Sequence, residues 1–141
     1  MIKASLRTLA GTFIGLFVAF VLIVAVEGFS AVVHPLPEDF GGTMDEMCRH
    51  VERYPQWVLA VVVPMWAVTA LLGTWIAQRI GNLYSSGIVG LLLLSALVFN
   101  ISKLPYPIWF KVVNLFVIPA AIVAGSRFSG RRKTAGSGEA N

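Results

Sequence analysis

Residues 9–26 read LAGTFIGLFVAFVLIVAV, an apolar run without a charged residue between Arg7 and Glu27. A helix needs about 20 mainly apolar residues to cross the hydrocarbon core of a bilayer, and this run with its flanks is long enough. Charges are absent in the same way from three later stretches, those between Arg53 and Arg79, between Arg79 and Lys103, and between Lys111 and Arg127. The four gaps predict four membrane spans.

The predicted spans cover about residues 8–33, 56–78, 85–102 and 107–125. Hydrocarbon cannot satisfy unpaired backbone groups, so each span must be a helix or a strand of a closed barrel, and the lengths favour helices. The predicted fold class is therefore all-α, an integral membrane four-helix bundle. A cleaved signal peptide is the alternative for the first span, and it fits poorly because no A-x-A-like site follows this long apolar core.

The composition excludes several classes of protein. With 57% hydrophobic and 13% charged residues, the chain is too apolar for a water-exposed surface, so we expect the lipid bilayer to surround it. The net charge of +4 comes without a basic face and interleaved stacking aromatics, so we expect no nucleic-acid partner. Cys48 is the single cysteine, which excludes an internal disulfide, a CxxC redox pair and a thiolate metal cluster.

Basic residues near the span ends predict the orientation, because cytoplasmic loops carry an excess of Lys and Arg. With a cytoplasmic N-terminus, the inside holds seven of them and the outside holds four: Lys3, Arg7, Arg79, Arg127, Arg131, Arg132 and Lys133 against Arg49, Arg53, Lys103 and Lys111. We therefore expect both termini in the cytoplasm, with residues 127–141 as a basic disordered tail.

The loop between the first two spans, residues 34–55, holds the only acidic region and is expected to lie outside. Thr43 and Glu46 have the spacing of a capping box, which predicts a short helix that ends before Pro55. Within it the apolar residues recur at i, i+3, i+4 and i+7, namely Met44, Met47, Cys48 and Val51. We expect an amphipathic extracytoplasmic helix, either a passive interfacial linker or a lid over the bundle.

Polar groups inside the spans are costly, so they are the candidate site residues. They form three stripes near the outer ends: Glu27, Ser30 and His34 in the first span, Asn100 and Lys103 in the third, and Lys111 and Asn114 in the fourth. Three roles are open. Glu27 and Lys111 form an ion pair that fixes helix register, or the cluster is a pocket for a small solute or lipid headgroup, or Glu27 exchanges a proton for a cationic substrate.

Catalytic motifs are missing from the sequence, which has no nucleophile elbow, phosphate-binding glycine loop, HExxH or paired carboxylates. We therefore expect no enzymatic activity and no cofactor. One His with one Glu provides too few ligands for a metal. Gly11 and Gly15 form a small-xxx-small face that suits packing within the chain or a homodimer.

Aromatic residues agree with the span ends. Tyr54, Trp57, Tyr106 and Trp109 mark one membrane interface, and Trp75 and Tyr84 mark the other. Trp66 falls near the middle of the second span, where we expect it to pack between helices.

The last two thirds of the chain, with ALLGTWIAQRI and then LPYPIWFKVVNLFVIPAAIVAG, resembles a group of short, functionally uncharacterised four-helix bacterial inner-membrane proteins. Their shared feature is a proline-rich turn followed by W-F-x-V, matched here by Pro105, Pro107, Trp109, Phe110 and Val112. The group often has an acidic residue where this chain has Asn114. The resemblance implies a bacterial inner-membrane location and no particular activity.

Small multidrug exporters are similar in having four helices and a glutamate in the first, but their carboxylate lies near the midplane and their loops are very short. Taken together, the sequence predicts a non-enzymatic structural, accessory or binding subunit of the inner membrane. The alternative is a small solute transporter or a proton-coupled exporter that uses Glu27.

Overall fold

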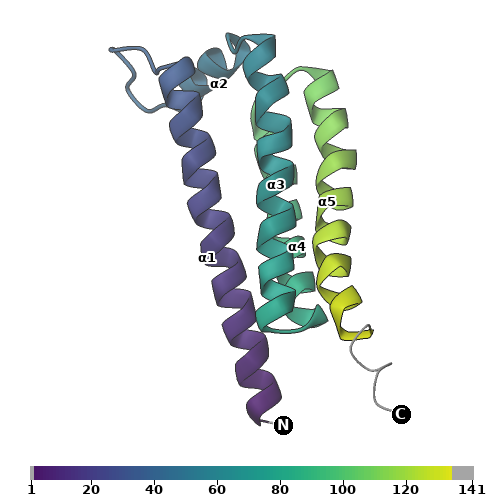
Figure 1. The fold of residues 1–141 in the computed structure, drawn as a ribbon. Helices are drawn as coiled ribbons and strands as arrows, with labels where there is room; N and C mark the ends of the chain where they lie inside the picture. Colours follow the sequence, from purple (N-terminus) through teal and green to yellow (C-terminus); the bar gives the residue numbers. More distant parts are fainter. Residues whose placement is uncertain (1, 135–141) are drawn as a thin grey trace, which may run out of the picture.

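A computed structural model describes residues 2–134, which form five helices and no strand (Figure 1). The helices are α1 (Ile2–Val33), α2 (Met44–Glu52), α3 (Gln56–Ile80), α4 (Leu83–Lys103) and α5 (Ile108–Thr134). All except α2 are long and apolar enough to cross a membrane. The predicted all-α class and the four apolar spans are confirmed.

The helix ends differ from the predicted spans in one important place. α5 continues through Thr134, so residues 127–134 are helical rather than disordered. Arg and Lys are good helix formers, and no proline interrupts this stretch, so the helix propagates past the apolar run at little cost. The remainder of the predicted tail, residues 135–141, lies outside the described residues.

α3 occupies the centre of the bundle and contacts α1, α4 and α5. In the described part of the chain, the backbones of α1 and α5 do not lie next to each other, because α3 lies between them (Figure 1). α4 packs behind α3 and contacts both outer helices. The backbone of α1 is therefore adjacent to those of α3 and α4 and not to that of α5.

Small residues let α1 approach α3 closely. Gly11 and Gly15 are buried, and a Cβ added to Gly15 would lie 2.6 Å from the Cβ of Ala77 and 2.8 Å from the carbonyl oxygen of Gly73. Of the two alternatives for this small-xxx-small face, the structure has the packing within the chain. The possible homodimer through Gly11 and Gly15 stays a prediction.

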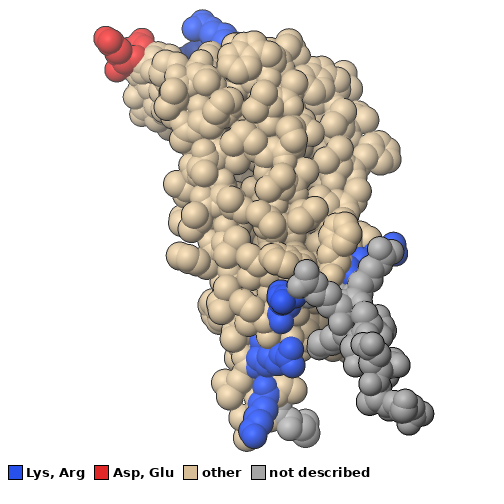
Figure 2. Space-filling model, viewed as in Figure 1, with Lys and Arg blue, Asp and Glu red and all other residues tan. Residues whose placement is uncertain are grey.

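The face drawn in Figure 2 has an uncharged belt between two charged ends. Figure 2 shows Lys and Arg at the end of the molecule that carries the N-terminus, and acidic and basic groups at the opposite end. In the belt, large apolar side chains such as Phe13, Phe17 and Phe20 of α1 are exposed. Such a surface suits contact with lipid.

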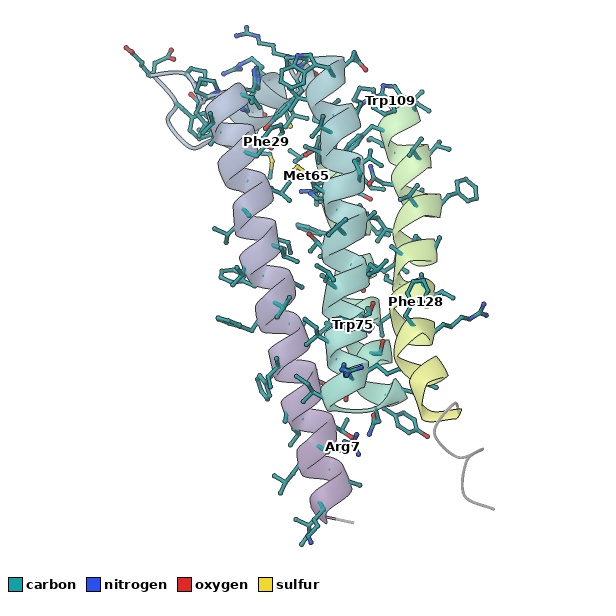
Figure 3. The ribbon with its side chains drawn as sticks, in the orientation of Figure 1. Arg7, Phe29, Met65, Trp75, Trp109 and Phe128 are labelled. Atoms are coloured by element: carbon teal, nitrogen blue, oxygen red, sulfur yellow. The ribbon has the colours of Figure 1, made fainter. Side chains whose placement is uncertain are left out.

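Hydrogen bonds fasten α1 to the turn between α3 and α4, at the end where Arg7 lies (Figure 3). Arg7 Nε donates to the carbonyl oxygen of Ile80 at 3.1 Å. Asn82, which caps α4, donates from Nδ2 to Thr8 Oγ1 at 2.7 Å, and Ser85 Oγ donates to the Thr8 carbonyl at 3.0 Å. α1 and α4 are therefore held together at this end.

Candidate functional site

α2 lies across the opposite end of the bundle, next to the end of α1 and the start of α3 (Figure 1). Thr43 Oγ1 accepts from the Glu46 amide at 3.3 Å, and the Glu46 carboxylate accepts from the Thr43 amide at 3.0 Å. Both halves of the predicted capping box are thus present. The hydrogen bonds from Thr43 favour the charged carboxylate and hold the pKa of Glu46 below its ordinary value.

One face of α2 is turned toward the bundle. Val51 is buried, and Met47 and Cys48 are half-buried, with Cys48 Sγ donating to the carbonyl oxygen of Lys103 at 4.0 Å. Met44, predicted on the same apolar face, is 59% exposed because it stands at the first position of the helix. α2 therefore covers the end of the bundle with its second half.

Two histidines and a tyrosine join α2 to α1. The rings of His34, just after α1, and His50 stack with centroids 4.3 Å apart, and the Tyr54 ring lies 4.5 Å from His34. His34 Nε2 lies 3.2 Å from the His50 carbonyl oxygen, to which it donates when protonated. Burial first, and then the nearby His34, lower the pKa of His50.

In residues 2–134 no three His, Cys, Asp or Glu side chains gather as a metal site.

The larger of two cavities that described residues line beneath this cluster has a volume of about 150 Å³ and is bounded by α1, α3, α4 and α5. Its walls are mainly apolar, formed by Ile23, Trp66, Ala70, Leu93, Ala96, Leu97 and Ile118, with Glu27, Thr69 and Asn100 as polar groups. Glu27 and Ala96, on its two sides, are both exposed. The cavity therefore opens at the surface between α1 and α4.

The smaller cavity, of about 30 Å³, lies closer to α2 and is also lined by Glu27 and Trp66. Ser30, Tyr54 and Tyr106 add hydroxyl groups to it, and the Ser30 hydroxyl interacts with that of Tyr54. Burial is the main cause that raises the pKa of both tyrosines, and the negative charge of Glu27 raises each further. Glu27 and Trp66 thus stand between two small cavities.

The apolar surroundings of these cavities come from α1, α3 and α5. Phe29 of α1 and Met65 of α3 lie at this end of the bundle (Figure 3) and pack against a buried cluster that includes Val26 and Phe110. The Trp66 ring meets Phe110 edge to face, with centroids 5.5 Å apart. This packing holds the indole of Trp66 beside Glu27.

The structure brings together only part of the predicted polar cluster. Glu27, Ser30 and Asn100 line the cavities, and His34 lies above them. Lys103 lies instead beside the Phe99 ring, with its ammonium 5.9 Å from the ring centroid. Asn114 is fully buried and donates to the Phe110 carbonyl at 2.8 Å, but lines neither cavity.

The predicted ion pair between Glu27 and Lys111 is not formed. The two residues lie on α1 and α5, which α3 separates, so equal depth in the membrane does not bring them into contact. Depth along a helix follows from the sequence, whereas the neighbours around the bundle do not. The hypothesis of a structural ion pair is therefore wrong for these two residues.

For four residues of the site, the role predicted from the sequence differs from the position in the structure. Tyr54 and Tyr106 were assigned to the membrane interface and Trp66 to packing, yet all three line a cavity with Glu27. His50 was not singled out, although it follows Met47 by three residues and so shares its face of the short helix. That spacing is the pattern that points to His50 in the sequence.

Comparisons of the chain with models of protein families, with curated proteins and with solved structures found no match. The resemblance to the four-helix bacterial group therefore stays a prediction.

Proposed function

We propose that this protein is a non-enzymatic binding or accessory subunit of the bacterial inner membrane that holds a small ligand in the cavity beside Glu27. The excess of basic residues at the N-terminal end supports a cytoplasmic location for both termini, with α2 outside (Figure 2). In this orientation the cavities lie toward the outer side of the membrane, and α2 covers the outer end of the bundle.

The position of Glu27 carries the proposal. Its carboxylate lines two cavities in an apolar span, and among the described residues it has no hydrogen-bond donor and no basic partner. A carboxylate at membrane depth costs several kcal/mol unless a partner or water compensates it. A purely structural role would need such a partner inside the protein. In a ligand site, the carboxylate has no partner until the ligand binds.

The hydrogen bonds that close one end of the bundle favour a binding protein over an exporter. α1 and α4 are joined by Thr8, Asn82 and Ser85 at one end, and the cavities lie toward the other. A ligand therefore enters and leaves on the same side. The alternative, a proton-coupled exporter, would require these hydrogen bonds to break and α1 to separate from the start of α4.

The test is to fill the cavity and look for loss of a bound molecule. Ala96→Phe places a ring at the mouth of the cavity, and Ala60→Phe is the matched control, because Ala60 is also exposed on a span but lines neither cavity. Native mass spectrometry of protein released from its own membranes should detect a small adduct in the parent and in Ala60→Phe, and not in Ala96→Phe. Identical spectra for all three folded proteins would contradict the proposal.

A further inference from the structure

The described residues around the two cavities carry negative charge and no positive charge. Among the described residues that line the two cavities, Glu27 is the only charged one. Both tyrosine hydroxyls stay protonated and neutral at physiological pH, since their pKa values are raised. An anionic ligand would be repelled by Glu27, and a neutral one would leave its charge uncompensated. The electrostatics of the cavity thus favour a cation.

Three of the residues that line the larger cavity carry a side-chain oxygen that can accept a hydrogen bond, namely Glu27, Thr69 and Asn100. Asn100 lines it, and the Asn100 Oδ1 atom is buried without a hydrogen-bond partner. Thr69 also lines it, and its hydroxyl proton is already donated to the Met65 carbonyl at 2.9 Å. The buried Asn100 Oδ1 atom lacks the donor that a buried acceptor requires, and the exposed Glu27 carboxylate lines the same cavity. A ligand that carries N–H groups would supply that donor.

The rest of the cavity suits an apolar group beside the charge. Trp66 lines both cavities next to Glu27, and a cation over an indole face is attracted by the ring. Ile23, Leu93 and Leu97 form an apolar wall in the same cavity of about 150 Å³. Apolar cavities of about this volume take up benzene.

From these three features we infer that the ligand is a primary or secondary organic ammonium with an apolar substituent. Its nitrogen donates to the Glu27 carboxylate and to Asn100 Oδ1, beside the Trp66 ring, and its substituent lies against Ile23, Leu93 and Leu97. This inference rests on the proposed function, because it names the ligand class of the same cavity. It also explains why a carboxylate and an amide oxygen without partners occur in one apolar cavity.

The experiment uses Trp66 as the reporter. Trp57, Trp75 and Trp109 are changed to Phe, and the full chain is placed in lipid nanodiscs at neutral pH. Three probes of similar shape are titrated: 2-phenylethylammonium, the neutral 2-phenylethanol and the anionic phenylacetate. We expect the ammonium to bind about tenfold tighter than the alcohol, because charge-assisted hydrogen bonds are about twice as strong as neutral ones. Phenylacetate should not bind.

Variants assign the preference to Glu27. Glu27→Gln should remove the difference between ammonium and alcohol, while Glu52→Gln, an exposed carboxylate on α2, should leave it unchanged. Asn100→Leu should weaken binding of the ammonium. Glu27→Asp keeps the charge and should retain selectivity for the cation, so it tests the inference if Glu27→Gln does not fold.

The outcomes separate this inference from the proposed function. If ammonium and alcohol bind equally and Ala96→Phe abolishes both, the cavity binds ligands and the inferred ligand class is wrong. If Glu27→Gln keeps the full preference for the ammonium, the role of the carboxylate is wrong. If no probe changes Trp66 emission at millimolar concentration, the inference fails, and the adduct measured for the parent and Ala96→Phe decides the proposed function independently.

Discussion

For Glu27, the depth in the membrane and the position around the bundle predict different neighbouring residues. By depth, Lys111 is the nearest basic residue, because the rise of about 1.5 Å per residue places both near the same level of the bundle. In the structure α3 separates the two helices that carry them. The energetic consequence is that the two charges should act independently.

The prediction for this pair is additivity. Glu27→Gln and Lys111→Met should each change the free energy of unfolding in detergent, and the double variant should show the sum to within about 0.5 kcal/mol, as distant sites without shared partners do. The measurement is a thermal or denaturant melt of the four proteins. Recovery of stability in the double variant would show that the two side chains meet after all.

A second residue, His50, predicts how stability depends on pH. Its pKa is lowered in the folded protein, so below about pH 6.5 the unfolded chain binds a proton that the folded chain does not. The unfolded state then gains stability, and the folded state becomes less stable as the pH falls from 6.5 toward the lowered pKa. His34 stacks on the same ring and Tyr54 lies 5.4 Å from it, so protonation also disturbs the contact between α1 and α2.

His50→Phe is the matched variant, because it keeps an aromatic ring and cannot take up a proton. The melting temperature is measured at pH 7.5 and at pH 5.5. Its decrease between these two pH values should be larger in the parent than in His50→Phe. An equal fall in both proteins would assign the acid sensitivity to other groups.

The role of a residue could be predicted from the sequence when it depends on nearby residues of the chain, and not when it depends on another helix. Glu27, Ser30 and Asn100 are polar residues in apolar spans, and the local sequence was enough to mark them. Trp66 and Tyr106 are ordinary membrane aromatics by sequence, and only the packing of α3 against its neighbours brings them to Glu27. Contacts between helices far apart in the chain have no local pattern.

At the scale of helices, the close packing of α1 against α3 makes a direct prediction. Gly15→Ala would place a methyl group 2.6 Å from the Ala77 Cβ, so the helices must move apart, at a cost of about 1–3 kcal/mol. Gly28→Ala on the same helix meets nothing within 4 Å and should be neutral or stabilising, because Ala favours a helix over Gly by about 1 kcal/mol.

The measurement for this pair is the melting temperature in one detergent, with the far-UV circular dichroism spectrum as a check on helix content. A loss of stability in Gly15→Ala together with none in Gly28→Ala supports the contact. Equal effects at both positions would mean that α1 is not packed on α3 through this face.

Helices were predicted better than their arrangement, for a physical reason. Thr43 and Glu46 are three residues apart and make the capping box without help from the rest of the protein. The end of α5 was misplaced because charge and glycine content suggested disorder, whereas Arg and Lys extend a helix that apolar residues have already nucleated. The central position of α3 depends on small residues such as Gly73 and Ala77, whose partners lie on another helix.

For the whole molecule, the distribution of charge determines what the cavity faces. The larger cavity is lined by Glu27 of α1 and Ala96 of α4, both exposed, so it opens between these two helices. If the basic end is cytoplasmic, ligands reach Glu27 from the outer half of the membrane. If the protein is inserted the other way, the same cavity is reached from the cytoplasmic side.

The last prediction therefore concerns orientation, and it uses two exposed positions at opposite ends of the bundle. In a Cys48→Ala background, Gly41→Cys lies in the loop before α2, and Tyr84→Cys lies at the start of α4, where the parent side chain is 79% exposed. A membrane-impermeant maleimide applied to intact spheroplasts should label Gly41→Cys at once and Tyr84→Cys only after lysis, because basic residues are retained in the cytoplasm. The reverse pattern would invert the protein, and labelling of both in intact cells would indicate two orientations. The argument for an organic ammonium uses only the inside of the cavity, so it survives either result, but the compartment that supplies the ligand changes with it.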